Sequence, residues 1–184
     1  AERVKQKRGF SVATFADRRE MRAWVPRMAD LYRNAFARAR GFAPLSDDEL
    51  AIFAETIIAV ADPRLIKLVL KGDEVVGFIL AYPNVTRGLQ RARGRLFPFG
   101  WYHLLRERRT TKHVDLNGVG LLPQYQGLGA NALLYAELAR SLIAFGAEYA
   151  DVVQVSEDNY KSLSDMEALG VHWHKVHRHY QRSL

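Results

Sequence analysis

One stretch of the sequence, DLNGVGLLPQYQGLGANALLYAEL at residues 115–138, carries residues whose types and spacing could bind an anion. The pattern predicts a strand, then a turn containing Gly127 and Gly129, then the first turns of a helix. The first N–H groups of a helix have no partner inside it, and the helix dipole adds partial positive charge there. We therefore expect a phosphate to bind above this helix, held by backbone N–H groups of residues 126–131.

Three phosphate-binding patterns compete for this turn. The Walker pattern ends in Gly-Lys-Ser/Thr, which this turn does not supply. The dinucleotide pattern G-x-G-x-x-G/A is satisfied by Gly127, Gly129 and Ala132, between a predicted strand and a predicted helix. Against it, residues 123–126 separate the strand from the first glycine, and the chain lacks the strand–helix alternation of a doubly wound sheet. The third pattern is an acyl-CoA motif, considered below.

In the strand before the turn, the alternation of apolar and polar residues shifts by one position. Val114 and Leu116 are apolar at even positions, whereas Val119 and Leu121 are apolar at odd positions. An alternation of period two shifts by one residue only where the strand contains an extra residue. We therefore predict a β-bulge at Gly118, which leaves backbone groups unpaired and splays the strand from its neighbour. The alternative is a slightly irregular strand with an incidental glycine.

The elements that must position this stretch follow from spacing and capping residues. Asp17 with Glu20, and Ser46 with Glu49, predict capping boxes at the starts of two helices, the first interrupted at Pro26. Further helices are expected at 134–145 and 159–169, and strands at 10–15, 65–70, 74–82, 113–122, 149–155 and 171–180.

Composition sets limits on the class of protein. The 184 residues fit one domain, and a hydrophobic content of 48% suffices for a packed core. The chain contains no cysteine, which excludes disulfides, thiolate nucleophiles and cysteine-based metal sites, and favours a cytoplasmic location. No apolar run reaches the roughly 18 residues of a membrane span, and no signal-peptide pattern is present. The chain begins with Ala1, so a processed chain and a piece of a longer protein both stay open.

The formal net charge of +7 favours anionic partners such as nucleic acid, lipid headgroups or a phosphorylated cofactor. Much of this charge falls in residues 83–112, which also carry the aromatic side chains of Phe97, Phe99, Trp101 and Tyr102. We interpret this segment as a lid or wall beside a binding site; the alternatives are an aromatic plug that completes the core and a solvated basic surface. Its two ends are predicted to be helical, at 85–93 and 101–109.

Residues 123–129, PQYQGLG, resemble the phosphate motif of the GNAT superfamily of N-acetyltransferases, which is commonly Pro-Glu-Tyr-Arg-Gly-x-Gly. In the register that this longer form prefers, Gln126 and Gly129 match, and Asn131 stands where a small residue is usual. A second register matches Gln124, Gly127 and Gly129.

The segment NYKSLSDMEALG also resembles a segment of that family, with Asn159, Ser162 and Gly170 in place. The order of predicted elements is similar as well, although the insertion at about 83–112 is not a general feature of the family. The resemblance implies an α/β (α+β) fold as a single domain over 1–184. Its central sheet would be mixed and mostly antiparallel, with helices on both faces and a splayed, bulged strand.

The resemblance further implies acetyl-CoA, or another acyl-CoA, as co-substrate, and no metal. The backbone N–H of Val119, just after the bulge, is expected to polarise the thioester carbonyl. The full set of expected cofactor contacts is Val119, Leu121, Gln126, Gly127, Leu128, Gly129, Ala130, Asn131 and Asn159. We read the histidines near the end of the chain as structural or surface residues rather than metal ligands: His172, His174, His177 and His179.

The expected reaction is direct attack of an amine on the thioester, without a covalent enzyme intermediate. An amine with a pKa of about 10.4 must first lose a proton, which costs roughly 4–5 kcal/mol at pH 7. The resemblance places the general base at Asp115, and Asn117 could hold a water. Met166 stands where the family usually has the tyrosine that acts as general acid, so Tyr160, Tyr125 or water would replace it, or the thiolate would leave unprotonated.

The acceptor is expected to be a small amine or amino compound, which the sequence does not identify. Its expected contacts are Tyr32, Phe42, Phe99 and Trp101. Met166 also fits a second class, a catalytically silent CoA-binding or sensory domain. The arginines of 87–109 fit a third class, a protein that binds RNA or an anionic surface, in which nucleic acid is the less favoured partner.

Overall fold

The computed structural model describes residues 8–28, 31, 45–178, 180 and 182. The chain forms two compact units, Ala1–Val153 and Gln154–Leu184, and each is described by itself. Tyr32 and Phe42, two of the residues predicted to contact the acceptor, lie outside the described residues. No helix in the described ranges is long and apolar enough to cross a membrane.

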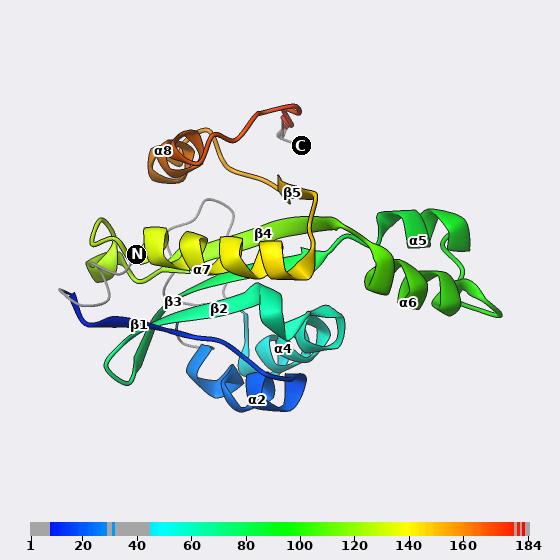
Figure 1. The fold of residues 1–184 in the computed structure, drawn as a ribbon, viewed down its shortest axis with the longest axis horizontal. Coiled ribbons are helices and arrows are strands. Elements are labelled where there is room, and N and C mark those ends of the chain that lie inside the picture. The colour runs from blue at the N-terminus through cyan, green and yellow to red at the C-terminus, as the bar shows by residue number, and fades with distance from the viewer. Residues whose placement is uncertain (1–7, 29–30, 32–44, 179, 181, 183–184) are drawn as a thin grey trace. The chain divides into compact units, whose positions relative to one another are not determined.

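A five-stranded sheet forms the centre of the first unit (Figure 1). Its strands lie side by side in chain order: β1 Phe10–Ala13, β2 Ile66–Lys71, β3 Glu74–Pro83, β4 His113–Leu121 and β5 Tyr149–Val152. Neighbouring strands from β1 to β4 are antiparallel, whereas β5 joins β4 in parallel. The predicted mixed, mostly antiparallel sheet is confirmed.

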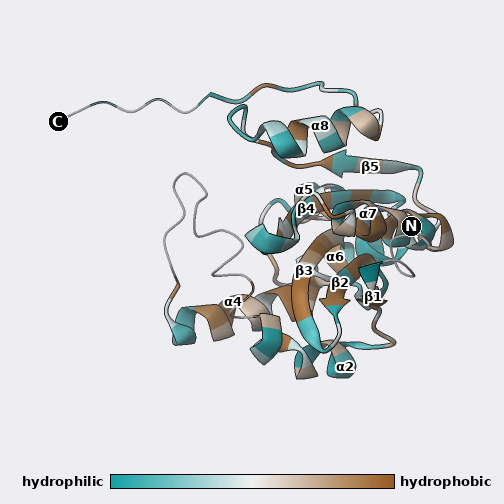
Figure 2. Cartoon of the chain, turned by 90° about the vertical axis from the view of Figure 1, so that its left-hand side faces the viewer, coloured by the Kyte–Doolittle hydropathy of each residue, from teal (hydrophilic) through white to brown (hydrophobic). Residues whose placement is uncertain are grey.

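Helices cover both faces of this sheet, as predicted. Helix α7 (Ala130–Phe145) packs on one face, where Leu133 and Leu134 are buried against Ile79. Helices α2 (Arg18–Ala23) and α4 (Asp47–Val60) lie on the other face, which is formed by side chains such as Phe78. Apolar residues concentrate in β2 and β3, between the two layers (Figure 2).

Local hydrogen bonds explain where the first helices start. Ser46 and Glu49 form the predicted capping box at α4, with each side chain bonded to the other's backbone N–H. At α2, Asp17 accepts from the N–H of Glu20, but the Glu20 carboxylate accepts from Ala16 rather than Asp17. The capping of both helices is therefore local, which is why the sequence pattern predicted it.

The segment between β3 and β4 forms a helical hairpin, α5 (Thr86–Ala92) followed by α6 (Gly100–Thr110). The predicted helical ends are confirmed. The alternative of an aromatic plug is wrong, because the aromatic side chains of the segment are exposed, including Phe97, Phe99, Trp101 and Tyr102. In Figure 1 the hairpin extends from the ends of β3 and β4, away from the rest of the sheet.

The second unit contains helix α8 (Tyr160–Ala168). Asn159 is its N-cap, as predicted, and accepts a hydrogen bond from the N–H of Ser162 at 3.2 Å. The predicted final strand at 171–180 is wrong, since the described residues there form no strand. The strand predicted at 149–155 as a buried type is also corrected: β5 ends at Val152, and Tyr149 is exposed.

Candidate functional site

The predicted bulge lies in β4, one residue before Gly118. Leu80 pairs with Gly118 while the next residue of β3, Ala81, pairs with Leu116, so Asn117 is the extra residue. Because of this insertion, the apolar side chains before and after it face the same way and pack in the core under α7: Val114, Leu116, Val119 and Leu121. The alternation of apolar residues therefore shifts at this point because the same face of β4 stays buried under α7 on both sides of the bulge.

Strands β4 and β5 separate at the bulge. Their pairing runs from His113–Tyr149 to Leu116–Val152, and the N–H of Val153 donates to the carbonyl of Leu116 at 3.1 Å. Beyond Leu116, β4 continues to Leu121 in register with β3 alone among the described strands. This leaves an edge of β4 along which an extended chain of amides could form backbone hydrogen bonds.

The glycine turn lies directly after this edge. A short 3-10 helix, Pro123–Tyr125, leads into it, and Gly127 and Gly129 both adopt positive φ, 73° and 87°. Gly129 is the N-cap of α7 and contributes no side-chain hydrogen bond to the first turn. Within the described chain, the N–H groups of Gly127, Leu128 and Gly129 donate to no other residue. The turn therefore presents donors at the positive end of a 16-residue helix.

One residue predicted to contact the cofactor, Gln126, has two hydrogen-bond partners within the protein. The backbone N–H of Gln126 donates to the carbonyl of Pro123 at 3.3 Å, and its side-chain amide donates to the carbonyl of Leu121 at 3.3 Å. Gln126 therefore joins the end of β4 to the turn, and its backbone N–H is already bonded within the protein. Its neighbours Gly127 and Leu128 are left to provide the donors.

Tyr125, which precedes the turn, is held by contacts with β3 and β1. Its hydroxyl donates to the Glu74 carboxylate at 2.8 Å, and its ring packs edge-on against Phe10. The hydrogen bond to Glu74 raises the pKa of Tyr125, so the phenol is a weaker acid than usual. Tyr125 is therefore poorly suited to the role of general acid that the sequence left open for it.

Asp115 precedes the bulge in β4, whereas the glycine turn follows it, and Asp115 pairs with Tyr82 of β3. The Asn84 amide donates to both carboxylate oxygens of Asp115, at 3.0 and 2.9 Å. Asn84 is itself fixed, because its N–H donates to the carbonyl of His113 and its Oδ1 accepts from the N–H of Thr86. The carboxylate of the predicted base is thus held in one orientation while remaining partly exposed.

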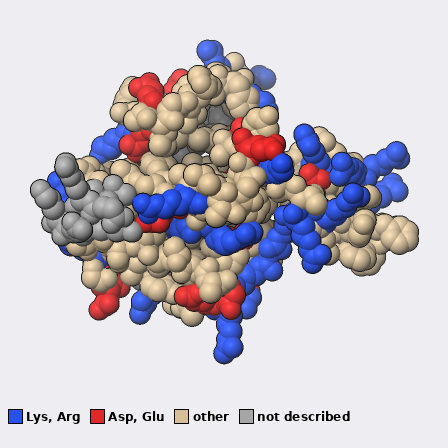
Figure 3. Space-filling view, in the orientation of Figure 1, with Lys and Arg blue, Asp and Glu red and all other residues tan. Residues whose placement is uncertain are grey.

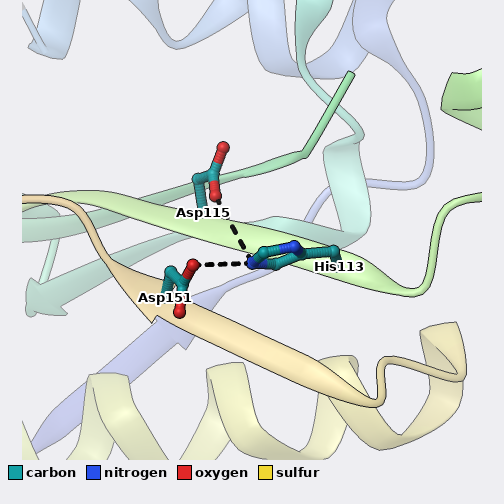
Figure 4. Close-up of side chains that lie close together, drawn as sticks. All are labelled: His113, Asp115 and Asp151. Atoms are coloured by element: carbon teal, nitrogen blue, oxygen red, sulfur yellow. Dashed lines mark hydrogen bonds and ion pairs between the residues drawn. The ribbon is translucent and has the colours of Figure 1, made fainter. Parts of the chain in front are cut away.

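A histidine completes this cluster (Figure 4). His113 Nε2 lies 2.8 Å from Asp151 and 4.0 Å from Asp115. A carboxylate only accepts hydrogen bonds, so the contact with Asp151 places a proton on Nε2. The three side chains offer ligand atoms within 4.8 Å of one another, a spacing compatible with a metal ion.

A hollow of about 420 Å³ opens where the bulge faces α4. Asn117 and Gly118 form its side nearest the bulge, and the remaining lining comes from α4 and β3: Phe53, Thr56, Ile57, Val60, Phe78, Leu80 and Tyr82. A smaller apolar cavity of about 50 Å³ lies between α2, α4 and the sheet and shares four of these side chains, Phe53, Ile57, Phe78 and Leu80. The described lining of the hollow contains no charged residue.

The structure brings together some of the predicted site residues and leaves others apart. Asn117 is the extra residue of the bulge, Asp115 lies two residues before it, and Val119 and Leu121 lie on the edge that leads to the glycine turn. Phe99 and Trp101 line neither cavity and are exposed on the hairpin. Asn159 belongs to the second unit, where it caps α8.

Sequence reasoning missed Asn84, His113 and Asp151, and it missed the lining from α4. His113 and Asp115 are two residues apart on one predicted strand, so their shared face was a signal that could have been used. Asn84 lies 31 residues before Asp115, and Asp151 lies 38 residues after His113, so no local pattern joins them.

Comparison with known proteins places this geometry in a family. Residues 25–171 match the model of the acetyltransferase (GNAT) family. The aminoglycoside N-acetyltransferase AAC(6')-Iy, solved in complex with CoA, superposes with a TM-score of 0.60 at 16% identity, covering 95% of each chain. PH1933 from Pyrococcus horikoshii OT3 gives a TM-score of 0.62 at 15% identity, covering 93% of this chain and 92% of its own. At these identities the likeness shows a shared fold.

Two curated proteins are similar in sequence. Protein YghO of Escherichia coli (strain K12) is 25% identical over 165 residues, which is 85% of this chain and 42% of YghO. The bacterial ceramide synthase of Caulobacter vibrioides (strain NA1000 / CB15N) is 24% identical over 166 residues, which is 87% of this chain and 43% of that protein. The chain thus spans less than half the length of these relatives. Since the family model covers both the bulged strand and the glycine turn, the chain belongs to the acetyltransferase (GNAT) family.

Proposed function

We propose that the protein transfers an acyl group from acyl-CoA to an amine. The observation that carries this proposal is the open edge of β4 beyond Leu116, which leads directly to the uncapped glycine turn of α7. Pantetheine is a chain of amides that suits a strand edge, and the CoA pyrophosphate suits the donors of Gly127, Leu128 and Gly129. Ala130 and Asn131, in the first turn of α7, are proposed to complete the phosphate site. The structural neighbour AAC(6')-Iy supports the choice of donor, since it was solved with CoA.

The chemistry is a direct displacement. The amine nitrogen attacks the thioester carbonyl carbon, the C–S bond breaks, and the CoA sulfur leaves with the bonding pair and takes up a proton. The N–H of Val119, after the bulge, is proposed to donate to the carbonyl oxygen as negative charge develops there. Water or another group must protonate the sulfur, because Met166 cannot and the Tyr125 hydroxyl is engaged with Glu74.

Asp115 is proposed to receive the amine proton, directly or through a water held by Asn117. Its partly exposed carboxylate is oriented by Asn84, and it lies opposite Tyr82, which lines the hollow. From Asp115, which is partly exposed, the proton passes to solvent water. Positioned general bases contribute about 10²–10⁴-fold to rate.

The hollow beside the bulge is proposed to hold the acceptor. Its described walls are mainly apolar and carry no acidic side chain, which disfavours polycationic amines such as aminoglycosides, whatever the structural neighbours acylate. An amine joined to an apolar body matches these walls better. A relative named for ceramide synthesis points in the same direction, because ceramides are lipid amides.

The proposed activity is tested by incubating the protein with acetyl-CoA or longer acyl-CoA and a series of amines, and following the release of CoA thiol. We expect turnover with amines that carry an apolar chain, and weaker turnover with polyamines and aminoglycosides. CoA binding without thiol release for any acceptor would favour the second candidate, a silent CoA-binding domain, for which Met166 is the specific observation.

A further inference from the structure

The hairpin of α5 and α6 is built without an apolar core of its own. A Cβ added to Gly88 would lie 2.9 Å from the carbonyl oxygen of His103, and one added to Gly100 would overlap the carbonyl oxygen of Arg95. The residues buried in the two helices are Gly88, Gly100 and Glu107. Gly88 thus lets α5 approach α6 closely, Gly100 lets the connection fold back against the start of α6, and most large apolar side chains of the hairpin are left exposed.

The exposed large apolar side chains of the two helices and their connection are here called the apolar surface of the hairpin. Phe97 is 84% exposed and Phe99 is 71% exposed, the highest values among the exposed large hydrophobic side chains of the segment. The rest of this apolar surface consists of Leu89, Leu96, Trp101, Tyr102 and Leu105, all exposed. Exposed apolar groups that lie together on a protein mark a surface that contacts a partner or a membrane.

Basic side chains surround this apolar surface. The exposed cations of the hairpin are Arg87, Arg91, Arg93, Arg95, Arg106, Arg109 and Lys112. The hairpin's single acid, Glu107, is buried and paired with Arg91 at 3.1 Å, so it adds little exposed negative charge. Figure 3 shows the result: blue side chains crowd the hairpin at the right, and uncharged side chains protrude among and beyond them.

We infer that the α5–α6 hairpin docks the protein on an anionic lipid surface. Arginines near the surface attract acidic headgroups, and tryptophan, tyrosine and phenylalanine favour the boundary between headgroups and acyl chains. RNA is the rival partner for a basic and aromatic surface. However, Leu89, Leu96 and Leu105 cannot stack on bases, whereas they can enter hydrocarbon. The aliphatic part of the surface therefore favours a membrane.

This inference does not rest on the proposed acyl transfer. The hairpin residues line neither cavity and lie outside the glycine turn. Membrane binding and acyl transfer are therefore tested independently, and a negative result for one does not contradict the other. An amine with an apolar chain partitions into a lipid bilayer, so the two proposals are compatible although neither depends on the other.

The test is flotation of the full chain with vesicles of phosphatidylglycerol and phosphatidylcholine in equal parts, compared with phosphatidylcholine alone. We expect binding to the anionic vesicles at low salt, weakened by salt, and little binding to the neutral ones. Single-stranded poly(U) serves as the rival probe. Binding to poly(U) without binding to anionic vesicles would overturn the inference in favour of RNA, and binding to neither would overturn it outright.

Matched variants locate the surface. Replacing Phe97 and Phe99 by serine should weaken vesicle binding about tenfold or more. The control replaces Ile143 and Val176, which are 80% and 84% exposed elsewhere, and should leave binding unchanged. Replacing Arg95, Arg106 and Arg109 by glutamine should also weaken binding about tenfold or more, and replacing Arg19, Lys175 and Arg178 should not. Equal losses in the hairpin and control variants would contradict the assignment.

Fluorescence gives a second readout that does not depend on affinity. Trp101 and Trp173 are similarly exposed, at 49% and 47%, but only Trp101 lies on the hairpin. Adding anionic vesicles should shift the emission to shorter wavelength in the wild type and in Trp173→Phe, and the shift should be lost in Trp101→Phe. A shift that persists in Trp101→Phe and disappears in Trp173→Phe would place the docking surface elsewhere.

Discussion

The N–H of Val153 donates to the carbonyl of Leu116 at 3.1 Å, and among the described residues this bond closes the ladder between β4 and β5. The next residue of β4, Asn117, is the extra residue of the bulge. The bulge and the parting of the strands therefore occur at the same point of the chain. Their coincidence leaves the edge of β4 beyond Leu116 without a partner among the described strands.

Deleting Asn117 should remove the bulge and keep the fold. Without it, the apolar residues on either side of the gap alternate regularly, so Leu116 and Val119 still face α7. We expect a melting temperature close to that of the wild type and a loss of kcat/KM for thioester transfer of about 100-fold, because the thioester is then misplaced. Circular dichroism and thiol release measure the two effects. Retention of full activity in a folded deletion variant would show that the bulge is not needed.

Replacing Asp115 by asparagine should slow the chemical step and leave acyl-CoA affinity intact. The change keeps the shape of the side chain and removes its capacity to take a proton, so kcat should fall by about 10²–10⁴-fold. The matched control is Asp73→Asn, a carboxylate in the exposed turn between β2 and β3. Comparable kcat values for Asp115→Asn and Asp73→Asn would exclude Asp115 as the base.

An arginine at position 60 should block the hollow that we assign to the acceptor. Val60 and Ile52 are both exposed on α4, but only Val60 lines the hollow. Val60→Arg should therefore raise the KM for an apolar amine about tenfold or more while the Kd for CoA stays within about twofold. Steady-state kinetics with Ile52→Arg as control separates the two positions; equal KM values in both variants would contradict the assignment.

Lys67 provides a test of stability against pH. It is buried in β2, and burial lowers the pKa of its ammonium group although Glu137 and Asp62 oppose the shift. A lowered pKa means that the charged form is less favourable in the folded state, so Lys67 reduces stability at neutral pH. This penalty diminishes as the pH rises from the lowered pKa toward the ordinary value of about 10.4.

Lys67→Met should therefore raise the melting temperature at pH 7 by a few degrees, corresponding to about 1 kcal/mol. The gain should shrink as the pH approaches 10, whereas the exposed Lys175→Met should show neither effect. Thermal melts across this pH range measure both. A gain that grows with pH would have the wrong sign for a lysine whose pKa is lowered by burial.

Features that depend on neighbouring residues could be predicted from the sequence. The capping box at Ser46 involves residues three apart, and the glycine turn needs only Gly127 and Gly129 at fixed places before a helix. The bulge could be placed within one residue because burial of Val119 and Leu121 under α7 demands a change of phase. Sequence patterns thus predict a structural feature when the residues that form it lie within a few positions of one another.

The acceptor side of the site could not be predicted in this way. Thr56 of α4 and Asn117 of β4 line one hollow although they are far apart in the sequence, so only the packing of α4 on the sheet brings them together. The aromatic hairpin was expected to form a lid or wall at the site. The close contacts at Gly88 and Gly100 instead leave its aromatic side chains exposed. A strand was predicted at 171–180, but the sequence of that segment could not show whether a sheet edge was available to pair with it.

The most direct test of the central claim is calorimetric titration of CoA into the wild type and two glycine variants. Gly127 and Gly146 have nearly equal φ values, 73° and 78°, and an added Cβ meets nothing within 4 Å at either position, so alanine costs each a similar strain of roughly 1–2 kcal/mol. Only Gly127 lies in the proposed phosphate site; Gly146 caps the opposite end of α7. We predict that CoA binds the wild type and Gly146→Ala alike and binds Gly127→Ala at least about tenfold more weakly. No heat of binding for the wild type at millimolar CoA, or equal affinity in all three proteins, would contradict the claim that the glycine turn and the open edge of β4 form an acyl-CoA site.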